Sequence, residues 1–367
     1  MLCNDMSLFR HLRAITILGL DRFDFARPGS SDPGQKRGFG NPLRAILDSL
    51  ILAILVTLAL SSCASPTPTA APGPPASHQE LARHYAPVIH QGVASDQDFI
   101  TAVDFDGDWV GNNNWENQST GDLSAHVYYS VAETETHWFL FYALFHPRDY
   151  TRDPCEKSEG CHENDMESIQ MVVAKDGTPF GKLLAVETLA HSHIYLYAAD
   201  RSVAGSFLKI RGSVRLEGSH PVVYVETYGH GIYAHRKILL PHTVVYRVGE
   251  RAEVPESLGD DYVSYQLVSI YDTIWTHRDE IGPGRAFDHP FSYRGHVLPA
   301  AIDGEDYGQD RANTPWGYDQ ATGDVLSRGD WFFDPVQALT YHASFEGEFS
   351  RKYVYNPYLA DLGLMGE

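Results

Sequence analysis

Short apolar segments separated by turn residues dominate the chain after position 78. They are rich in Val, Ile, Tyr and Phe, and Gly, Pro, Asp or Asn clusters lie between them, which is typical of β-strands. The segments are 124–131, 137–145, 168–173, 193–198, 207–216, 221–226 and 243–248. Helical periodicity is scarce, and one helix-compatible stretch, QELARHYAPVIH, opens the folded part and ends at Pro87. The pattern predicts a mainly β protein, an antiparallel β-sandwich with long loops and few short helices.

A second kind of pattern precedes the folded part. Residues 50–60 read LILAILVTLAL, with basic residues upstream and Ser61, Ser62 and Cys63 directly after. A run of this length fits a signal peptide and is too short for a membrane span of about 20 residues. LSSC resembles a bacterial lipoprotein cleavage box, so we expect Cys63 to become the lipidated N-terminus. An uncleaved anchor is the alternative.

These features divide the chain into three parts. Residues 1–62 form a pre-sequence and lipoprotein signal peptide, residues 63–77 a Pro/Ala/Thr-rich tether, and residues 78–367 a single β-sandwich-like domain with an extended loop-rich C-terminal part. Ala64 stands where many retained lipoproteins carry aspartate. We therefore expect a lipid-anchored protein of the bacterial cell envelope, at the outer membrane or cell surface, with the membrane as a partner.

The charge balance limits the partners. The formal net charge is −20, and residues 63–367 alone carry 21 basic and 43 acidic side chains, a net of −22. Such a surface repels phosphate backbones and anionic headgroups, so nucleic-acid binding is excluded as a function class and cation binding is favoured.

Two of the four cysteines lie in the folded part. Cys3 precedes the signal peptide and Cys63 is the lipid site, which leaves Cys155 and Cys161. In an oxidising exported compartment this spacing predicts a local disulfide. The alternative is a pair of thiolate metal ligands, although the neighbouring donors are rich in oxygen.

The densest candidate chemistry lies next to these cysteines, in FLFYALFHPRDYTRDPCEKSEGCHENDMESIQMVV at 139–173. His162, Asp165 and Glu167 offer an imidazole and two carboxylates, a donor set that suits a divalent cation such as Ca²⁺, Mg²⁺ or Mn²⁺. In an extended segment Asp165 and Glu167 share one face, and a turn can bring His162 to it. Asp149 or Asp153 can arrive from the preceding strand. The alternative is a solvated acidic loop whose carboxylates cap turns.

This segment resembles the necrosis- and ethylene-inducing-peptide-like (necrosis-inducing protein) family. The family signature reads roughly YAWYFPKD, a loop, then GHRHDWE; here FYALFHPRD spans 141–149 and CHENDME spans 161–167. The resemblance implies a cation at the edge of a β-sandwich, held by Asp149, His162, Asp165 and Glu167. It also implies recognition of a sugar headgroup of plant sphingolipids, followed by membrane damage. This chain departs from the signature at Glu163, Asn164 and Met166. We expect these departures to change the molecule that is recognised more than the metal site.

A further segment, SHPVVYVETYGHGIY at 219–233, is similar to the His-Pro and strand of those toxins. It also resembles HPVVYxAxxSHAxY of a vacuolar protein-sorting-like family that carries a related HDGDWE motif. Together the matches cover roughly residues 128–235.

Several other histidines and acidic loops are candidate ligands. His191 and His193 alternate on a strand and could share Zn²⁺, and His220, His230 and His235 are possible accessory residues. DFDGDWVGNNNWEN at 104–117 begins like an EF-hand loop but lacks its glycine and glutamate positions, so a calcium-stabilised or purely structural turn is expected. The loop at 301–313 is similar.

Aromatic residues could also contact a sugar, although core packing is their usual role. The candidates are Trp109, Trp115, Trp316, Trp331 and Tyr318. No GxSxG, P-loop or Rossmann glycine pattern is present.

The sequence thus favours a non-enzymatic, cation-assisted binding module with a glycan or glycolipid headgroup as ligand. One alternative is a metal-dependent hydrolase in which Glu163 or His193 serves as general base for an ion-activated water. The other is a structural lipoprotein whose ion only stabilises a loop.

Overall fold

The computed structural model describes residues 75–153, 155, 161–234, 242–304, 312–318 and 326–366. The predicted signal peptide, Cys63 and the tether up to residue 74 lie outside the described residues, as does His235. Within the described ranges, no helix has both the length and the apolar character needed to cross a membrane.

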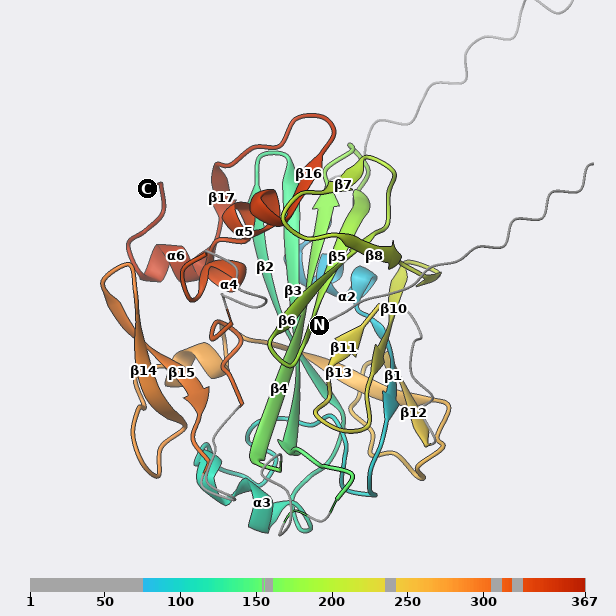
Figure 1. The fold of residues 1–367 in the computed structure, drawn as a ribbon, viewed down its shortest axis with the longest axis vertical. Coiled ribbons are helices and arrows are strands. Elements are labelled where there is room, and N and C mark those ends of the chain that lie inside the picture. The colour runs from blue at the N-terminus through green and yellow to red at the C-terminus, as the bar shows by residue number, and fades with distance from the viewer. Residues whose placement is uncertain are drawn as a thin grey trace, which may run out of the picture. The chain divides into compact units, whose positions relative to one another are not determined.

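Most strands belong to one large mixed sheet (Figure 1). Along this sheet the strands follow the order β11-β10-β1-β12-β13-β2-β3-β4-β5-β6-β8. Their bounds are β1 Val88–Gly92, β2 His126–Thr134, β3 His137–Arg148, β4 Glu163–Ala174, β5 Lys182–Ala190, β6 His193–Ala198, β8 Ile210–Ser213, β10 His220–Val225, β11 Ile232–Tyr233, β12 Thr243–Val248 and β13 Val263–Ser269. Two short strands join it, β9 Leu216–Glu217 beside β10 and β17 Tyr353–Tyr355 beside β2.

Two further pairs are separate from this sheet. They are the hairpin of β14 Phe287–Tyr293 with β15 His296–Ile302, and β7 Val203–Gly205 with β16 Ala343–Phe345. The helices are short: α2 His78–Tyr85, η1 Gly111–Asn113, α3 Asn114–Asn117, η3 Ile274–His277, α4 Asp330–Phe333, α5 Pro335–His342 and α6 Pro357–Asp361. The helix predicted before Pro87 is confirmed as α2, and Ser77 and Glu80 form a capping box at its start.

The mainly β prediction is confirmed, but a sandwich of antiparallel sheets is not. Strands β2 to β6 are antiparallel neighbours, whereas β1–β10, β12–β13, β13–β2 and β6–β8 are parallel. Segments far apart in the chain therefore pair directly, and β1 lies between β10 and β12. Alternation of apolar and polar residues predicts that a segment is a strand, but it carries no information about the neighbour or its direction.

The sheet curls so that its β11 end returns to β4 and β5. The approach is close: a Cβ added to Gly231, just before β11, would lie 2.9 Å from the Cβ of Ala190 at the end of β5. The curl brings the connection between β10 and β11 beside the first half of β4. Residues from two distant parts of the chain consequently meet at one point.

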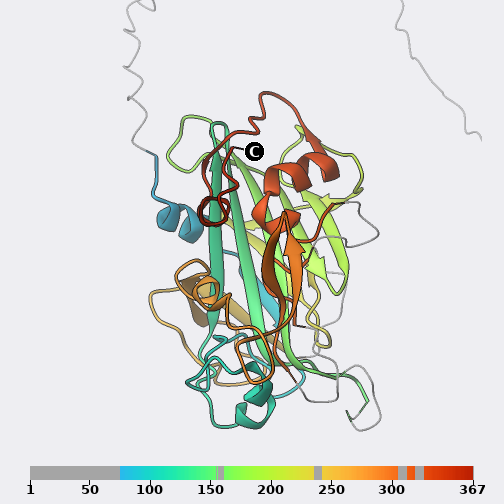
Figure 2. The same cartoon turned by 90° about the vertical axis from the view of Figure 1, so that its left-hand side faces the viewer.

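Both faces of the central strands are covered (Figure 2). Strands β3 and β4 are buried along nearly their whole length. On one face α2 packs against Leu140 and Tyr142, and on the other the C-terminal aromatics Trp331 and Phe332 pack against Phe141. Trp316 belongs to the same aromatic core. This two-sided burial explains why β3 reads as a continuous apolar run.

The sequence predicted the presence of several strands correctly, but it predicted their bounds less well. The predicted segments 193–198 and 243–248 match β6 and β12, while 207–216 contains the short strand β8 and ends at the first residue of β9. Strands β5 and β13 were missed. Glu187 interrupts the apolar pattern of β5, and it is accommodated only because the buried side chains of His342 and Trp331 bind its carboxylate at 2.8 Å each.

Candidate functional site

A single cavity of about 410 Å³ contains all four side chains that the sequence singled out as metal ligands. We call it the carboxylate cavity, and its wall is formed by Asp149, His162, Asp165, Glu167, His191, Ser192, Gly229, His289, Ala301, Asn313 and Tyr318. These residues come from the facing ends of β3 and β4, the β5–β6 turn, the β10–β11 connection, the β14–β15 hairpin and the segment after it.

Strand β4 and the residue before it bring three candidate ligands to the cavity through one break in the alternation of side chains. Asp165 and Glu167 lie two positions apart and both face the cavity, as predicted. His162 lies three positions before Asp165. In a regular strand an odd separation puts two side chains on opposite faces, so His162 would point away from the cavity. Asn164 has a φ of 55°, in the left-handed region, and this turns the chain so that His162 also reaches the cavity.

The side chain of Asn164 holds that turn in place. It is fully buried, and its amide donates to the carbonyls of Gly111 at 2.9 Å and Asp303 at 2.7 Å. Its oxygen accepts from the amide of Asn114 at 2.6 Å. Asn164 therefore connects β4 to two other segments, a role that the sequence alone did not indicate.

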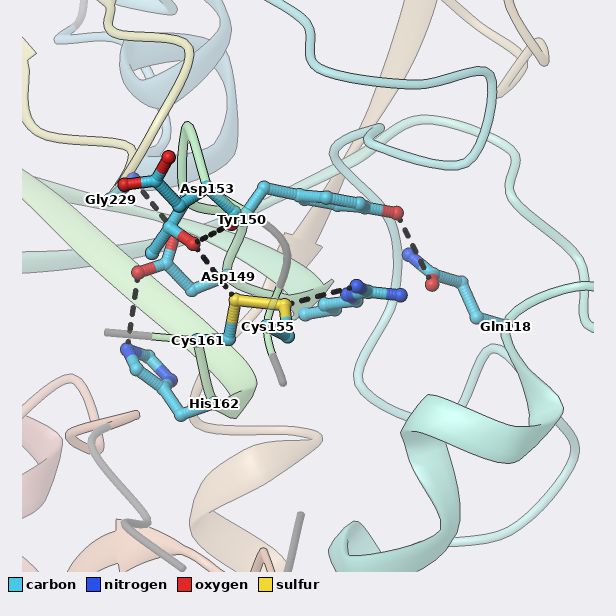
Figure 3. Close-up of a disulfide and its surroundings, with 10 residues drawn as sticks. Gln118, Asp149, Tyr150, Asp153, Cys155, Cys161, His162 and Gly229 are labelled. Carbon is cyan, nitrogen blue, oxygen red and sulfur yellow. Dashed lines mark hydrogen bonds and ion pairs between the residues drawn. A yellow bond between two sulfur atoms is a disulfide. The ribbon is translucent and has the colours of Figure 1, made fainter. Parts of the chain in front are cut away.

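A disulfide closes the loop between Asp149 and His162 (Figure 3). Cys155 and Cys161 are bonded with Cα atoms 5.4 Å apart, so the predicted disulfide is confirmed and the thiolate-ligand alternative is wrong. The backbone N–H of Asp149 donates to the carbonyl of His162 at 2.9 Å. The Nε2 of His162 lies 3.3 Å from the Oδ2 of Asp149. The two candidate ligands at the loop ends are thus adjacent.

The opposite wall holds the carboxylates through backbone groups. The N–H of Gly229 donates to the Oδ1 of Asp149 at 2.7 Å, and the N–H of His191 donates to the Oε1 of Glu167 at 2.7 Å. The His191 ring lies 2.5 Å from the carboxylate of Glu226. Gly229 has a φ of 72°, and a Cβ there would lie 2.5 Å from the His191 ring. A side chain at position 229 would therefore be strained and would have to displace the His191 ring.

Glu167 is the electrostatic centre of the site. Burial raises the pKa of Glu167 well above its ordinary value, and repulsion from Asp165 adds to the effect. Its second oxygen, Oε2, is buried and has no hydrogen-bond partner among the described residues. A buried carboxylate oxygen without a donor is costly unless a proton or a cation binds it.

Asp149 and His162 behave as a charged pair. Burial opposes the charged form of His162, but the neighbouring Asp149 and Asp165 outweigh it and raise the pKa of His162. Burial likewise opposes ionisation of Asp149, yet the hydrogen bond from His162 lowers the pKa of Asp149. A separation of 3.3 Å is also about that expected for two adjacent ligands of one divalent cation.

His230 lies behind the cavity wall in a fully buried position. Its Nδ1 is 2.7 Å from Asp165 and its Nε2 is 2.8 Å from Asp98. The ring of His146 stacks on it at 3.7 Å. Burial opposes the charged form, but Asp98 and Asp165 raise the pKa of His230 well above its ordinary value. His230 was an expected accessory residue, whereas Asp98 and His146 were missed because buried polar residues inside apolar segments have no spacing signature.

Of the other accessory histidines, only His191 reaches the cavity. His191 is part of the cavity wall, but His193 is exposed and stacks near Tyr195. His220 binds the carbonyl of Ala86 through Nδ1 at 2.7 Å. Among the described residues, the group of three or more His, Cys, Asp or Glu side chains whose ligand atoms lie close enough to share one metal is His146, Asp165 and His230. The possible His191–His193 zinc pair stays a prediction, and His193 is not among the residues that line the cavity.

Most remaining candidates have structural roles. In the 104–117 loop, Asp106 and Asp108 accept backbone N–H groups two residues ahead, and Asp106 also binds Asn117. Glu163 is buried and accepts the N–H of Trp115 at 2.8 Å. Residues 305–311 of the 301–313 loop lie outside the described residues.

The aromatic candidates separate in the same way. Trp316 and Trp331 are core residues, Trp109 stacks on His277, and Trp115 lies under the guanidinium of Arg148. Only Tyr318 lines the carboxylate cavity. Tyr318 is therefore the one candidate aromatic ring that could contact a ligand in the carboxylate cavity.

Among known proteins, only solved structures resemble this chain, and each resembles only part of it. No family model matches the chain, and no curated protein matches it. Solved structures of the necrosis-inducing toxin group resemble parts of it. One is Necrosis and Ethylene inducing Protein 2 from the causal agent of cocoa's witches' broom disease, at 16% identity over 55% of this chain and 78% of that chain, with a TM-score of 0.31.

Two others are NLPPya in complex with glucosamine and with mannosamine. They are 20% and 16% identical to this chain, cover 45% of it and 73% of their own length, and have TM-scores of 0.28 and 0.27. No comparison supports the resemblance to the vacuolar protein-sorting-like family. The likeness in fold is partial, and the chemistry of the site rests on the geometry above.

Proposed function

We propose that the carboxylate cavity binds a divalent cation and, through it, a glycan or glycolipid headgroup. The observation that carries the cation is Glu167, whose buried Oε2 has no donor among the described residues. A cation bound by Asp149, His162, Asp165 and Glu167 would supply that missing positive charge. Three carboxylates and one imidazole form a hard donor set, which favours Ca²⁺, Mg²⁺ or Mn²⁺.

The cavity also has the size and polar groups of a small-ligand site. Its volume of about 410 Å³ falls in the lower part of the usual range for such pockets. Beyond the candidate ligands, Ser192, Asn313, Tyr318 and His289 line it. Hydroxyl and amide groups next to a cation with open coordination positions suit the vicinal hydroxyls of a sugar, with Tyr318 as an apolar face.

The proposal includes a place in the cell. With Cys63 lipidated and a Pro-rich tether of the kind that stays extended, the domain would stand away from a bacterial envelope membrane. There it would meet glycans outside the cell. Labelling of cells with a palmitate analogue tests this part, because a Cys63→Ser variant should lose the label.

The same cavity fits a metal-dependent hydrolase less well than a binding site. Neither of the two general bases that the sequence suggested, Glu163 and His193, is among the residues that line the cavity. The Glu163 carboxylate instead accepts the backbone N–H of Trp115. We therefore propose binding without catalysis.

The test is a glycan array probed with the purified protein in Ca²⁺ and then in chelator. The expected result is binding that the chelator abolishes and that Glu167→Gln weakens at least tenfold, while His193→Gln, an exposed histidine next to the site, binds as wild type. Binding that survives chelation, or no binding to any glycan, contradicts the proposed ligand. Calorimetric titration with Ca²⁺ alone tests the cation separately.

A further inference from the structure

We propose a second, interior metal site formed by His146, His230 and Asp165, which would take a nitrogen-preferring divalent metal such as Zn²⁺. One ligand atom from each of the three side chains lies within 4.8 Å of the others. The site is distinct from the four-ligand site in the carboxylate cavity, and it shares only Asp165 with it.

His146 is the observation that points to a ligand. It is fully buried, and neither of its ring nitrogens has a hydrogen-bond partner among the described residues. Leaving both the donor and the acceptor of a buried imidazole unsatisfied costs about 1–3 kcal/mol for each group. A metal bound to one nitrogen would remove part of that cost.

The strand register directs His146 toward the cluster. In the β3–β4 pair, His146 lies directly opposite Asp165, so the two side chains leave neighbouring strands on the same face. The His146 ring is stacked on His230 at 3.7 Å with planes 10° apart.

His230 has the environment of a metal-binding histidine. One nitrogen, Nε2, is 2.8 Å from Asp98, and the other, Nδ1, is 2.7 Å from Asp165. A histidine ligand commonly donates its second N–H to a carboxylate, which fixes its orientation. Asp98 would fill that role, and the metal would replace the proton shared by Nδ1 and Asp165.

Donor chemistry separates this site from the outer one. Two imidazoles and one carboxylate favour Zn²⁺ and its neighbours, whereas the outer site has one imidazole and three carboxylates and favours Ca²⁺, Mg²⁺ or Mn²⁺. With both sites filled, Asp165 would bridge two metal ions, as carboxylates do in two-metal centres. The inference does not depend on glycan binding.

The test loads the metal-free protein with Zn²⁺ in saturating Ca²⁺ and measures the zinc environment by X-ray absorption. We expect one bound zinc with two imidazole nitrogens. Zinc in the outer site would have one imidazole, from His162, so a count of one or none overturns the proposal. This measurement needs no variant. The absence of zinc binding also overturns the proposal, and His230 would then serve only to link Asp98 and Asp165 by hydrogen bonds.

Variants give an independent readout by equilibrium dialysis. His146→Phe keeps the ring stacking and removes both nitrogens, so zinc affinity should fall at least tenfold while Ca²⁺ affinity is unchanged. Asp149→Asn should show the opposite pattern, and His193→Gln should bind both metals as wild type. Equal zinc binding by wild type and His146→Phe contradicts the site. Circular dichroism checks that each variant is folded.

Discussion

At the scale of residues, the carboxylate cavity holds more negative charge than its own donors can balance. Asp149 has His162 and a backbone N–H, and Asp165 has His230, but Glu167 has a single backbone N–H on one oxygen. Burial raises the pKa of Glu167 well above its ordinary value, which favours the protonated form when no cation is bound. A divalent cation would displace the proton.

Glu167→Gln tests this account directly. The amide has nearly the same shape and mimics the protonated acid, so the melting temperature measured in chelator should stay close to that of wild type. Ca²⁺ affinity, measured by calorimetry, should fall at least tenfold because a charged ligand is lost. Unchanged Ca²⁺ affinity would show that Glu167 is not a ligand.

At the scale of elements, β4 has regular side-chain alternation except at Asn164, near its start. From Asp165 onward its side chains alternate between the two faces, while Asn164 reverses the phase for His162. Local side-chain hydrogen bonding makes asparagine more tolerant of the left-handed region than most residues. Here buried amide hydrogen bonds to Gly111, Asn114 and Asp303 hold this conformation.

A pair of variants separates the backbone effect from the side-chain effect. Asn164→Ala should destabilise the fold by about 2–4 kcal/mol, because it leaves buried polar partners unsatisfied and puts alanine at positive φ. Asn164→Gly loses the same bonds without the positive-φ strain and should be about 1 kcal/mol less destabilised. Urea unfolding measures both. If glycine were as damaging as alanine, the conformation of residue 164 would carry no cost.

The disulfide loop links the two candidate ligands at its ends. Cys161 directly precedes His162, and the backbone of Asp149 pairs with that of His162. Replacing both cysteines by serine should destabilise the fold by about 2 kcal/mol, from the loop-entropy relation for a loop this short. Ca²⁺ affinity should fall as well.

The matched control for the disulfide variant is wild type treated with reductant, which should reproduce both effects. Calorimetry and thermal unfolding in the same buffers make the comparison. A double variant with full Ca²⁺ affinity would show that β3 and β4 hold Asp149 and His162 without the loop.

At the scale of the whole molecule, the curl of the mixed sheet assembles the site. From the β10–β11 connection, Gly229 reaches Asp149, directly after β3, and His230 reaches Asp165 of β4, over about 80 and 65 positions of the chain. The C-terminal part then forms further wall, since Ala301, Asn313 and Tyr318 line the same cavity. A cation in this place would tie several distant segments together.

Cation binding should therefore stabilise the fold as a whole. At a Ca²⁺ concentration about 100 times Kd, the gain is about 2.7 kcal/mol, and for a domain of this size we expect a rise in melting temperature of about 5 °C. Thermal unfolding with Ca²⁺ and with chelator measures it. Glu167→Gln should show little of the shift, and an equal shift in both proteins would assign it to other sites.

Much of the candidate site could be predicted because most of its candidate ligands are close in the chain. Period-two alternation placed Asp165 and Glu167 on one face, and cysteine spacing predicted the Cys155–Cys161 disulfide. The strands that could be predicted, such as β6 and β12, carry a local apolar pattern. Local patterns act over a few residues, so the sequence by itself determined which segments are strands and which donors lie side by side.

Only the tertiary structure decided the rest, because long-range pairing leaves no local pattern. It inserted β1 between β10 and β12, made the large sheet mixed, and buried Glu187 against His342 and Trp331. It also placed His146 and Asp98 beside His230, three residues from separate segments that no spacing connects. Neighbour choice and burial depend on how the whole sheet curls, and that is a property of all its strands together.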